Sequence, residues 1–380
     1  MGLLRILLAF NVVVLHTNPI DGLTMLPGGL PVKTFFVISG FYMAFIFSGR
    51  YSESPRAFYL NRSLQIYPLL WVVAALELIR TAVFVLVLNE PPRWWLNFQH
   101  VFTGSGVLLA ITYAFSQLTL VGVDAFHLFS WSPDSGLELH GGTTTGDDYL
   151  RGWRPFPMSH TWALSCIMLF YALTPLVTRS STAVLALVCL GVTAFNFTSY
   201  LWIDPQLATV AVSFFGPLQL GYFIFGMIAY RFSLRLKPLY GSRRRCIALG
   251  ILPFVSIFAT QHVQTYTYTG GLAMLWTTIF LGMPALFKLS SGFELDRLLG
   301  QLSFPVYLVH ISCIRLVSPL FKELPDVSSF VMPVTIMSLS LIAAYILKTS
   351  IGKAVERVRE TIRQGAIKAA PPRTALPPES

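Results

Sequence analysis

Hydrophobic residues in this chain occur in long continuous runs separated by short polar connections. Most runs have roughly the 17 to 25 residues that a helix needs to cross ~30 Å of hydrocarbon. They predict helices at residues 2–17, 31–48, 66–88, 101–122, 159–178, 183–202, 207–230, 246–261, 270–288, 302–320 and 329–348. Because the runs do not alternate polar with apolar residues, helices are favoured over the strands of a membrane barrel. The pattern predicts an all-α, polytopic transmembrane helical bundle.

Composition supports a membrane protein. The chain has 380 residues, of which 54% are hydrophobic and only 12% are charged, about half the charged fraction of an ordinary globular domain. The mean hydropathy of +0.64 excludes a disordered chain. Four isolated cysteines, without a CxxC pair or a Cys/His cluster, are interpreted as small core residues, so neither a disulfide scaffold nor a metal site is expected. They are Cys166, Cys189, Cys246 and Cys313.

The distribution of Lys and Arg predicts the orientation, because short cytoplasmic loops carry an excess of both. The connection 231–245 holds six basic residues and no acidic one, and the tail 349–380 is also basic, so both are expected to be cytoplasmic. The stretch 131–158 contains four acidic residues and is expected to be external. If Arg5 and the basic connection 49–65 are cytoplasmic, the region 66–130 must cross the membrane an odd number of times, yet it holds two hydrophobic runs. One of them, most simply 101–122, is therefore expected to be re-entrant or interfacial. This leaves about ten crossings with both termini cytoplasmic.

The chain divides into a transmembrane domain, 1–348, and a basic cytoplasmic tail, 349–380. Residues 353–368 form a candidate basic amphipathic helix lying on anionic headgroups. The Pro-rich end from residue 369 is predicted to be disordered. The first hydrophobic segment has one alternative interpretation, as a cleaved signal peptide.

Two ionisable residues in the first segment, Arg5 and His16, are the sharpest candidates for function, because such groups are costly inside a membrane. Eleven residues at 100° each bring both side chains to one face of a helix, about 16 Å apart along its axis. We expect Arg5 at the cytoplasmic headgroups and His16 deep in the bundle. This arrangement suits a donor whose anionic head stays in the cytoplasm while its reactive end reaches inward. The alternative is a membrane anchor and a hydrogen-bonded core histidine.

Further ionisable residues lie in later segments. Glu77 and Arg80 are three residues apart and are expected to form a neutralised structural pair, with a substrate site as the alternative. His310 is interpreted as a hydrogen-bonded core histidine, and Arg315 is expected to extend toward an interface. The histidines in or beside loops have weaker claims, and they are His100, His140, His160 and His262.

Four stretches resemble, in order, the motifs of the acyltransferase 3 family of integral-membrane O-acyltransferases. The segment 2–16 resembles its opening Arg-x10-His helix, FFVISGF its second motif, NRSLQIYPLLW its third, and LGQLSFPVYLVH its late motif. They occupy residues 2–16, 35–41, 61–71 and 299–310. Two positions depart from the pattern. The third motif has Gln65 where a second Arg is usual, and WALSCIMLFY, beginning at Trp162, has Ile167 where a Glu is expected.

The resemblance implies transfer of an acetyl or other short acyl group from acetyl-CoA, a co-substrate rather than a bound cofactor, to a carbohydrate hydroxyl. Exopolysaccharide, lipopolysaccharide or a lipid-linked sugar would be the acceptor, at the bacterial cytoplasmic (inner) membrane. His16 would act as general base. Arg5 and Arg62, with the 231–245 connection, would hold the CoA phosphates, and Ser39 and Gly40 would allow close helix packing.

Glu77, Tyr67, Trp162 and His310 are candidate supporting residues. No metal is implied, and no nucleic-acid partner is expected because the net charge of +10 lies in loops beside the membrane. Two other functions stay open. In a glycolipid or sugar transporter, Glu77, Arg80 and His310 would line a path. In a catalytically impaired relative, the chain would act with polysaccharide-synthesis proteins.

Overall fold

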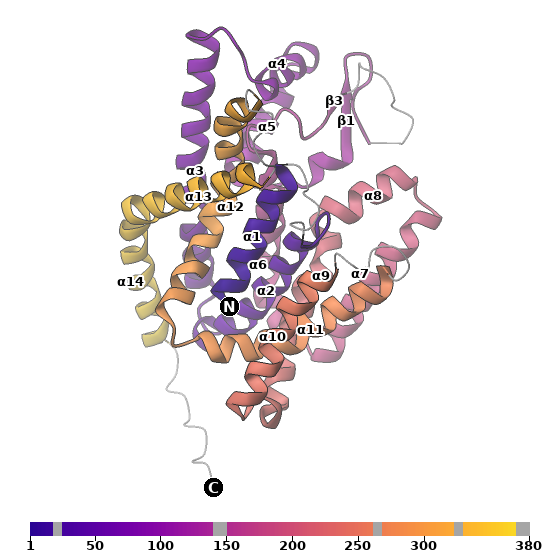
Figure 1. Ribbon diagram of the computed structural model, residues 1–380. Helices are drawn as coiled ribbons and strands as arrows, with labels where there is room; N and C mark the ends of the chain where they lie inside the picture. The colour runs from indigo at the N-terminus through magenta and orange to yellow at the C-terminus, as the bar shows by residue number, and fades with distance from the viewer. Residues whose placement is uncertain (18–24, 140–149, 261–267, 323–329, 370–380) are drawn as a thin grey trace.

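Helices make up nearly all of the computed structural model, which describes residues 1–17, 25–139, 150–260, 268–322 and 330–369 (Figure 1). The helices are α1 (Gly2–His16), α2 (Leu30–Ile46), α3 (Pro55–Leu86), α4 (Arg93–Ser105), α5 (Val107–Thr119), α6 (Trp162–Arg179), α7 (Thr182–Thr198), α8 (Pro205–Phe214), α9 (Gly216–Arg235), α10 (Arg243–Thr260), α11 (Tyr268–Ser290), α12 (Glu294–Lys322), α13 (Val331–Leu347) and α14 (Lys353–Ala369). The predicted all-α bundle is confirmed.

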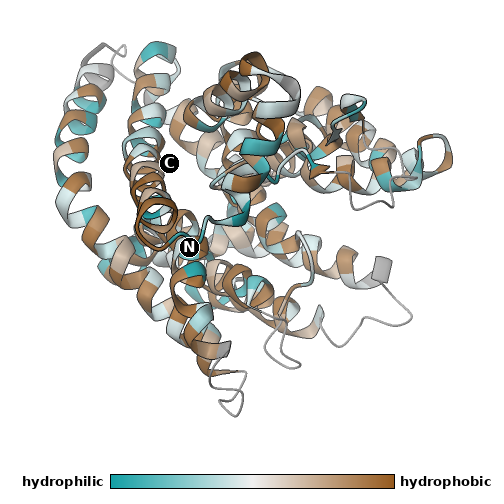
Figure 2. Cartoon of the chain, turned by 90° about the horizontal axis from the view of Figure 1, so that it is seen from above, coloured by the Kyte–Doolittle hydropathy of each residue, from teal (hydrophilic) through white to brown (hydrophobic). Residues whose placement is uncertain are grey.

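Seven of the described helical segments are long and apolar enough to cross a membrane, and an eighth results if α8 and α9 form one bent span. Helices α1 and α5 are apolar but shorter. Large apolar side chains are exposed on the outer helices, as with Leu86, which is 81% exposed. Figure 2 shows hydrophobic colour along outward-facing helices, a surface suited to hydrocarbon. The chain is an integral membrane protein, while the count of ten crossings and the cytoplasmic termini stay predictions.

Two predicted spans are broken in the structure. Residues 101–122 divide between α4 and α5 at Gly106, whose φ of +79° is one that only glycine adopts without strain. The prediction of an unbroken helix over 207–230 is wrong, because α8 and α9 meet at a 45° bend around Phe215. Pro217 follows at the start of α9, and the N–H of Gly216 donates to the Asp124 carboxylate at 2.8 Å. A side chain from another segment therefore satisfies the backbone at the break.

A small antiparallel sheet lies within the stretch predicted to be external. Its strands β1 (Phe129–Ser132), β2 (Gly136–Leu139) and β3 (Leu150–Arg151) have the spatial order β2-β1-β3. In Figure 1 this sheet lies toward one end of the bundle, and the first residue and the last turn of α14 lie toward the other. This separation is compatible with the predicted orientation.

Glycines allow two pairs of helices to approach closely. A Cβ added at Gly40 in α2 would overlap the carbonyl of Phe223 in α9, and one added at Gly226 would overlap the carbonyl of Val37. Gly40 therefore lies at a close helix contact, whereas the same role for Ser39 stays a prediction. Helices α1 and α12 also lie side by side, and a Cβ at Gly300 would be 3.4 Å from the Cα of Gly2.

Helix α14 is packed against α3. It follows α13 through the π-helical turn η6 (Lys348–Gly352). The amide Nδ2 of Asn61, a fully buried residue of α3, donates to the carbonyl of Arg359 at 3.2 Å. Contact of this helix with headgroups stays a prediction, and the predicted disorder beyond residue 369 lies outside the described residues.

Candidate functional site

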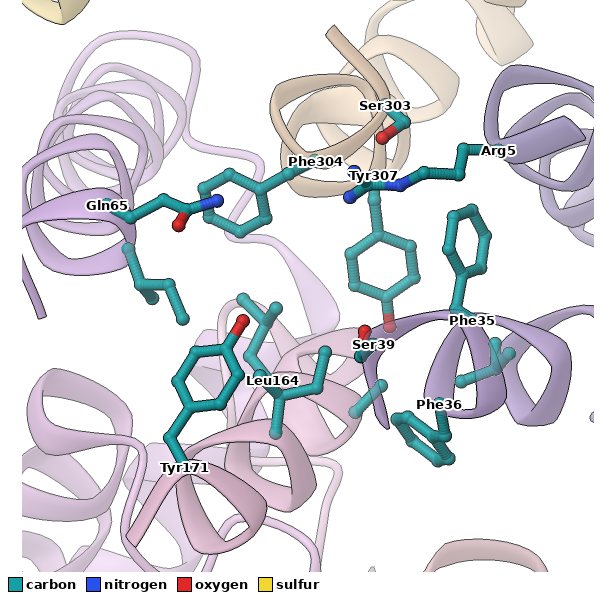
Figure 3. Close-up of a pocket in the computed structure, with 14 residues that line it drawn as sticks. Arg5, Phe35, Phe36, Ser39, Gln65, Leu164, Tyr171, Ser303, Phe304 and Tyr307 are labelled. Carbon is teal, nitrogen blue, oxygen red and sulfur yellow. The ribbon is translucent and has the colours of Figure 1, made fainter. Parts of the chain in front are cut away.

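Five helices, α1, α2, α3, α6 and α12, surround a small pocket with a volume of about 70 Å³. Most of its wall is apolar. The polar lining residues are Arg5, Ser39, Gln65, Tyr171, Ser303 and Tyr307. Figure 3 shows Arg5 and Gln65 entering from opposite sides, with the Tyr171 hydroxyl directed into the space between them. Such a pocket, apolar with a few convergent polar groups, is typical of a small-molecule site.

Arg5 is the lining residue that carries a positive charge. Its Nε is buried and has no hydrogen-bond partner among the described residues. Burying part of a guanidinium without a partner is unfavourable, so the site favours an anionic ligand. The pocket therefore presents a cationic group that a phosphate or carboxylate could neutralise.

Three histidines that do not line the pocket gather near Tyr307. The ring centroids of His16 and His310 are 5.3 Å apart, and those of His160 and His310 are 5.1 Å apart. The Tyr307 ring lies 5.4 Å from that of His310 and 5.7 Å from that of His160. Within the described residues no three His, Cys, Asp or Glu side chains are arranged to hold a metal ion. We call His16, His160 and His310 the histidine cluster.

Hydrogen bonds to carbonyls define where the protons of this cluster lie. Nδ1 of His310 is 2.6 Å from the Tyr307 carbonyl oxygen, and Nε2 of His160 is 3.1 Å from the Leu308 carbonyl oxygen. A carbonyl only accepts, so these two nitrogens carry the hydrogens. In the neutral rings, His310 Nε2 and His160 Nδ1 are then free acceptors, and neither has a partner among the described residues. The cluster therefore has proton-accepting capacity beside His16.

Helix α12 joins the pocket to the histidine cluster. Ser303, Tyr307 and His310 are spaced i, i+4 and i+7, which places them on one helix face. The first two line the Arg5 pocket, and the third contacts the ring of His16. Arg5 and His16 therefore both face α12, the first at the pocket and the second at the cluster.

His16 is the last residue of α1. The residue is exposed, but its ring packs against the buried His310, so its depth in the bundle stays a prediction. Helix α1 ends here because Thr17 leaves the helical backbone conformation (φ −106°, ψ 14°), and its N–H donates to the carbonyl of Val14 at 3.2 Å. The imidazole contacts that of His310, and the residue as a whole remains exposed.

Glu77 forms the centre of a buried ion network rather than a simple pair. Its carboxylate is 2.9 Å from Arg80, the expected partner, and also 2.9 Å from Arg315 in α12. Glu77 is only 2% exposed. The Arg315 guanidinium donates to Glu77 and to the carbonyl of Pro157, 2.8 Å away, a residue of the stretch predicted to be external, and its extension toward an interface stays a prediction. The network ties α3 to α12.

The other candidate residues, Arg62, Tyr67 and Trp162, contact protein groups outside the pocket. Arg62 is buried outside the pocket, where it donates to the Asn61 side chain at 3.0 Å. Tyr67 donates to the Thr119 carbonyl at 2.6 Å, which holds the end of α5. Trp162 packs edge-on against Phe214, with centroids 5.0 Å apart.

The basic connection 231–245 contributes no lining residue to the pocket. Its first residue, Arg231, donates instead to the carbonyls of Thr178 and Ser180, each at 2.7 Å. The structure therefore does not bring this segment to Arg5.

The sequence reasoning underestimated several site residues. His160 was assigned a weak claim because it lies near a loop, yet it is buried beside His310. Tyr307 lies three residues before His310, a helical spacing that could have drawn attention to it. Gln65 and Ile167, the two departures from the motif pattern, both line the Arg5 pocket.

Comparison with known proteins supplies the family. No curated protein and no solved structure matches the chain. The family model Acyl_transf_3, described as an acyltransferase domain, matches residues 1–349. That range includes α1 through α13, with every lining residue of the Arg5 pocket and the whole histidine cluster. The chain belongs to the acyltransferase 3 family and is a membrane acyltransferase by that membership.

Proposed function

We propose that this protein transfers an acetyl or similarly short acyl group from acyl-CoA to a carbohydrate hydroxyl, with His16 as the general base. One observation carries the proposal. Arg5 and His16 face the same helix, so that α12 connects an anion-accepting pocket to a cluster of proton-accepting imidazoles. This geometry fits a donor with a charged head and a reactive thioester at the far end of a flexible arm.

The reaction needs one proton acceptor and one leaving group. His16 removes the proton of the acceptor hydroxyl as the oxygen attacks the thioester carbonyl, the C–S bond breaks, and the CoA thiolate takes a proton from the imidazolium. His310, whose ring lies against that of His16, orients the base. Arg5 binds a phosphate of the donor, and the mostly apolar pocket wall accommodates the arm.

Exposure of His16 bears on how the acceptor reaches the site. Because His16 is exposed and does not line the Arg5 pocket, the acceptor hydroxyl can approach it without entering that pocket. Donor and acceptor then occupy separate sites that meet at His16. An exopolysaccharide, a lipopolysaccharide or a lipid-linked sugar at the cytoplasmic membrane fits this arrangement, with polysaccharide-synthesis proteins as candidate partners.

The test is transfer of radiolabelled acetyl from acetyl-CoA by the purified protein, with glycan and lipid-linked sugar extracts as acceptors. His16→Ala should lower the rate about 10²- to 10⁴-fold, the usual contribution of a general base. Arg5→Gln should mainly raise the KM for acetyl-CoA. The control is His100→Ala, which removes an exposed histidine of α4 outside the cluster. Undiminished transfer by His16→Ala, or no transfer by folded wild-type protein with any extract, would overturn the proposal.

A further inference from the structure

Arg359 crosses from α14 to the edge of the Arg5 pocket. Its Nη2 lies 3.2 Å from Asn61 Oδ1 and 3.4 Å from Gln65 Oε1, and its side chain is 16% exposed. Gln65 is itself a lining residue, opposite Arg5 (Figure 3). The family match ends at residue 349, so α14 adds a guanidinium that the matched region does not contain.

The arginines at this edge carry more positive charge than the neighbouring side chains neutralise. Arg62 donates to the same Asn61 oxygen that Arg359 uses. One neutral amide therefore serves two guanidinium groups, and the Nε atoms of both are buried with no partner among the described residues. Two like charges on one acceptor are stable only when an anion or solvent offsets their repulsion.

The carboxylates of α14 offset this charge only in part. Glu356 lies 2.6 Å from Arg359, but it is half exposed and also contacts Arg363. Glu360 contacts Arg363 at 3.0 Å. Arg5 and Arg62 have no carboxylate partner among the described ion pairs. The pocket and its edge therefore retain a net positive charge.

We propose that Arg359 of α14 joins Arg62, which the family resemblance already assigns to the donor phosphates, in a second anion site beside the Arg5 pocket, and that this site binds a phosphate group of the nucleotide part of the acyl donor. This rests on the proposed function, which supplies acyl-CoA as the donor. Gln65, which lines the pocket and accepts from Arg359, adds no charge of its own, so the positive charge of Arg5, Arg62 and Arg359 is available to an anionic ligand. Helix α14 thereby becomes part of the donor site instead of a separate tail.

The test measures equilibrium binding of radiolabelled CoA, which requires no transfer, to the full-length protein. Arg359→Gln should weaken CoA binding roughly ten-fold, as expected for one charge-assisted hydrogen bond of about 1.4 kcal/mol. Transfer from acetyl-pantetheine, which lacks the nucleotide, should be unchanged. Arg357→Gln is the matched control, because it removes the same charge from an exposed position on the same helix.

A second variant predicts an effect of the opposite sign. Glu356→Gln removes the carboxylate that competes for Arg359, so CoA should bind more tightly, and a merely structural ion pair would not produce this gain. Equal CoA binding by wild-type and Arg359→Gln proteins, or weaker binding by Glu356→Gln, would overturn the inference. If wild type binds CoA with the expected dependence on Arg359 but transfers nothing, the proposed function fails and the anion site stands. If wild type binds no CoA, the anion site is refuted as well.

Discussion

Replacing Glu77 by Gln discriminates between a structural ion network and a substrate site. The carboxylate accepts from Arg80 through two nitrogens, Nε at 3.2 Å and Nη2 at 2.9 Å, and from Arg315 Nη1 at 2.9 Å. The substitution keeps the size of the side chain and removes its charge. Arg80 and Arg315 then face each other without a counterion.

The expected loss follows from these contacts. A hydrogen bond to a charged group contributes about 1.5 to 3 kcal/mol, and two arginine partners would give about 3 to 6. Arg80 and Arg315 are 22% and 27% exposed, so solvent relieves part of the repulsion. The lower end, about 3 kcal/mol, is the expected destabilisation, in line with breaking a buried ion pair.

The assay is the half-life of the detergent-solubilised protein at a fixed temperature, measured together with acetyl transfer per folded molecule. Glu77→Gln should shorten the half-life strongly and leave transfer by the surviving folded protein nearly unchanged. Glu90→Gln, an exposed carboxylate in the connection after α3, is the control. A Glu77→Gln protein of wild-type stability that has lost transfer or transport would refute the structural reasoning and place Glu77 in a substrate path.

Three further changes test other parts of the structure. Gly226→Ala should destabilise the α2–α9 contact, because its Cβ would overlap the Val37 carbonyl, whereas Gly191→Ala, with open space around it, should be tolerated in the same thermal assay. Ile167→Glu should place a carboxylate in the Arg5 pocket and raise the KM for acetyl-CoA. Adding Gln65→Arg should lower that KM part of the way back. Higher transfer by the Ile167→Glu variant than by wild type would instead show that the wild-type protein is an impaired enzyme. Burial lowers the pKa of His127 to about 4. As the pH falls from 6.5 to 4, only the unfolded chain gains a proton at this residue, so the free energy of unfolding should drop by up to about 3 kcal/mol. His127→Gln should remove that part of the pH dependence.

Sequence patterns predicted the local features of the fold well. Continuous apolar runs indicated the helices because a helix is the simplest way to satisfy the backbone within hydrocarbon. Helical periodicity indicated that Arg5 and His16 share a face, and both do face α12. The break near Phe215 was missed because Asp124, more than 90 residues earlier, stabilises it.

Long-range pairs could not be predicted from the sequence. Arg315 contacts Glu77 across 238 positions, and Arg359 contacts Gln65 across 294. A single sequence contains no local signal for such contacts, because they depend on how the helices pack. His160 was misjudged for the same reason, since only the fold brings it against α12.

The two departures from the family pattern acquire a joint explanation in the structure. Gln65 stands where a cation is usual and Ile167 where an anion is expected, and both line one pocket. Replacing one charge of each sign leaves the net charge of the pocket wall unchanged, and Arg359 adds a cation beside Gln65. No residue of the histidine cluster lines this pocket. The departures therefore change the pocket wall rather than the group that we propose removes the proton, so loss of transfer does not follow from them.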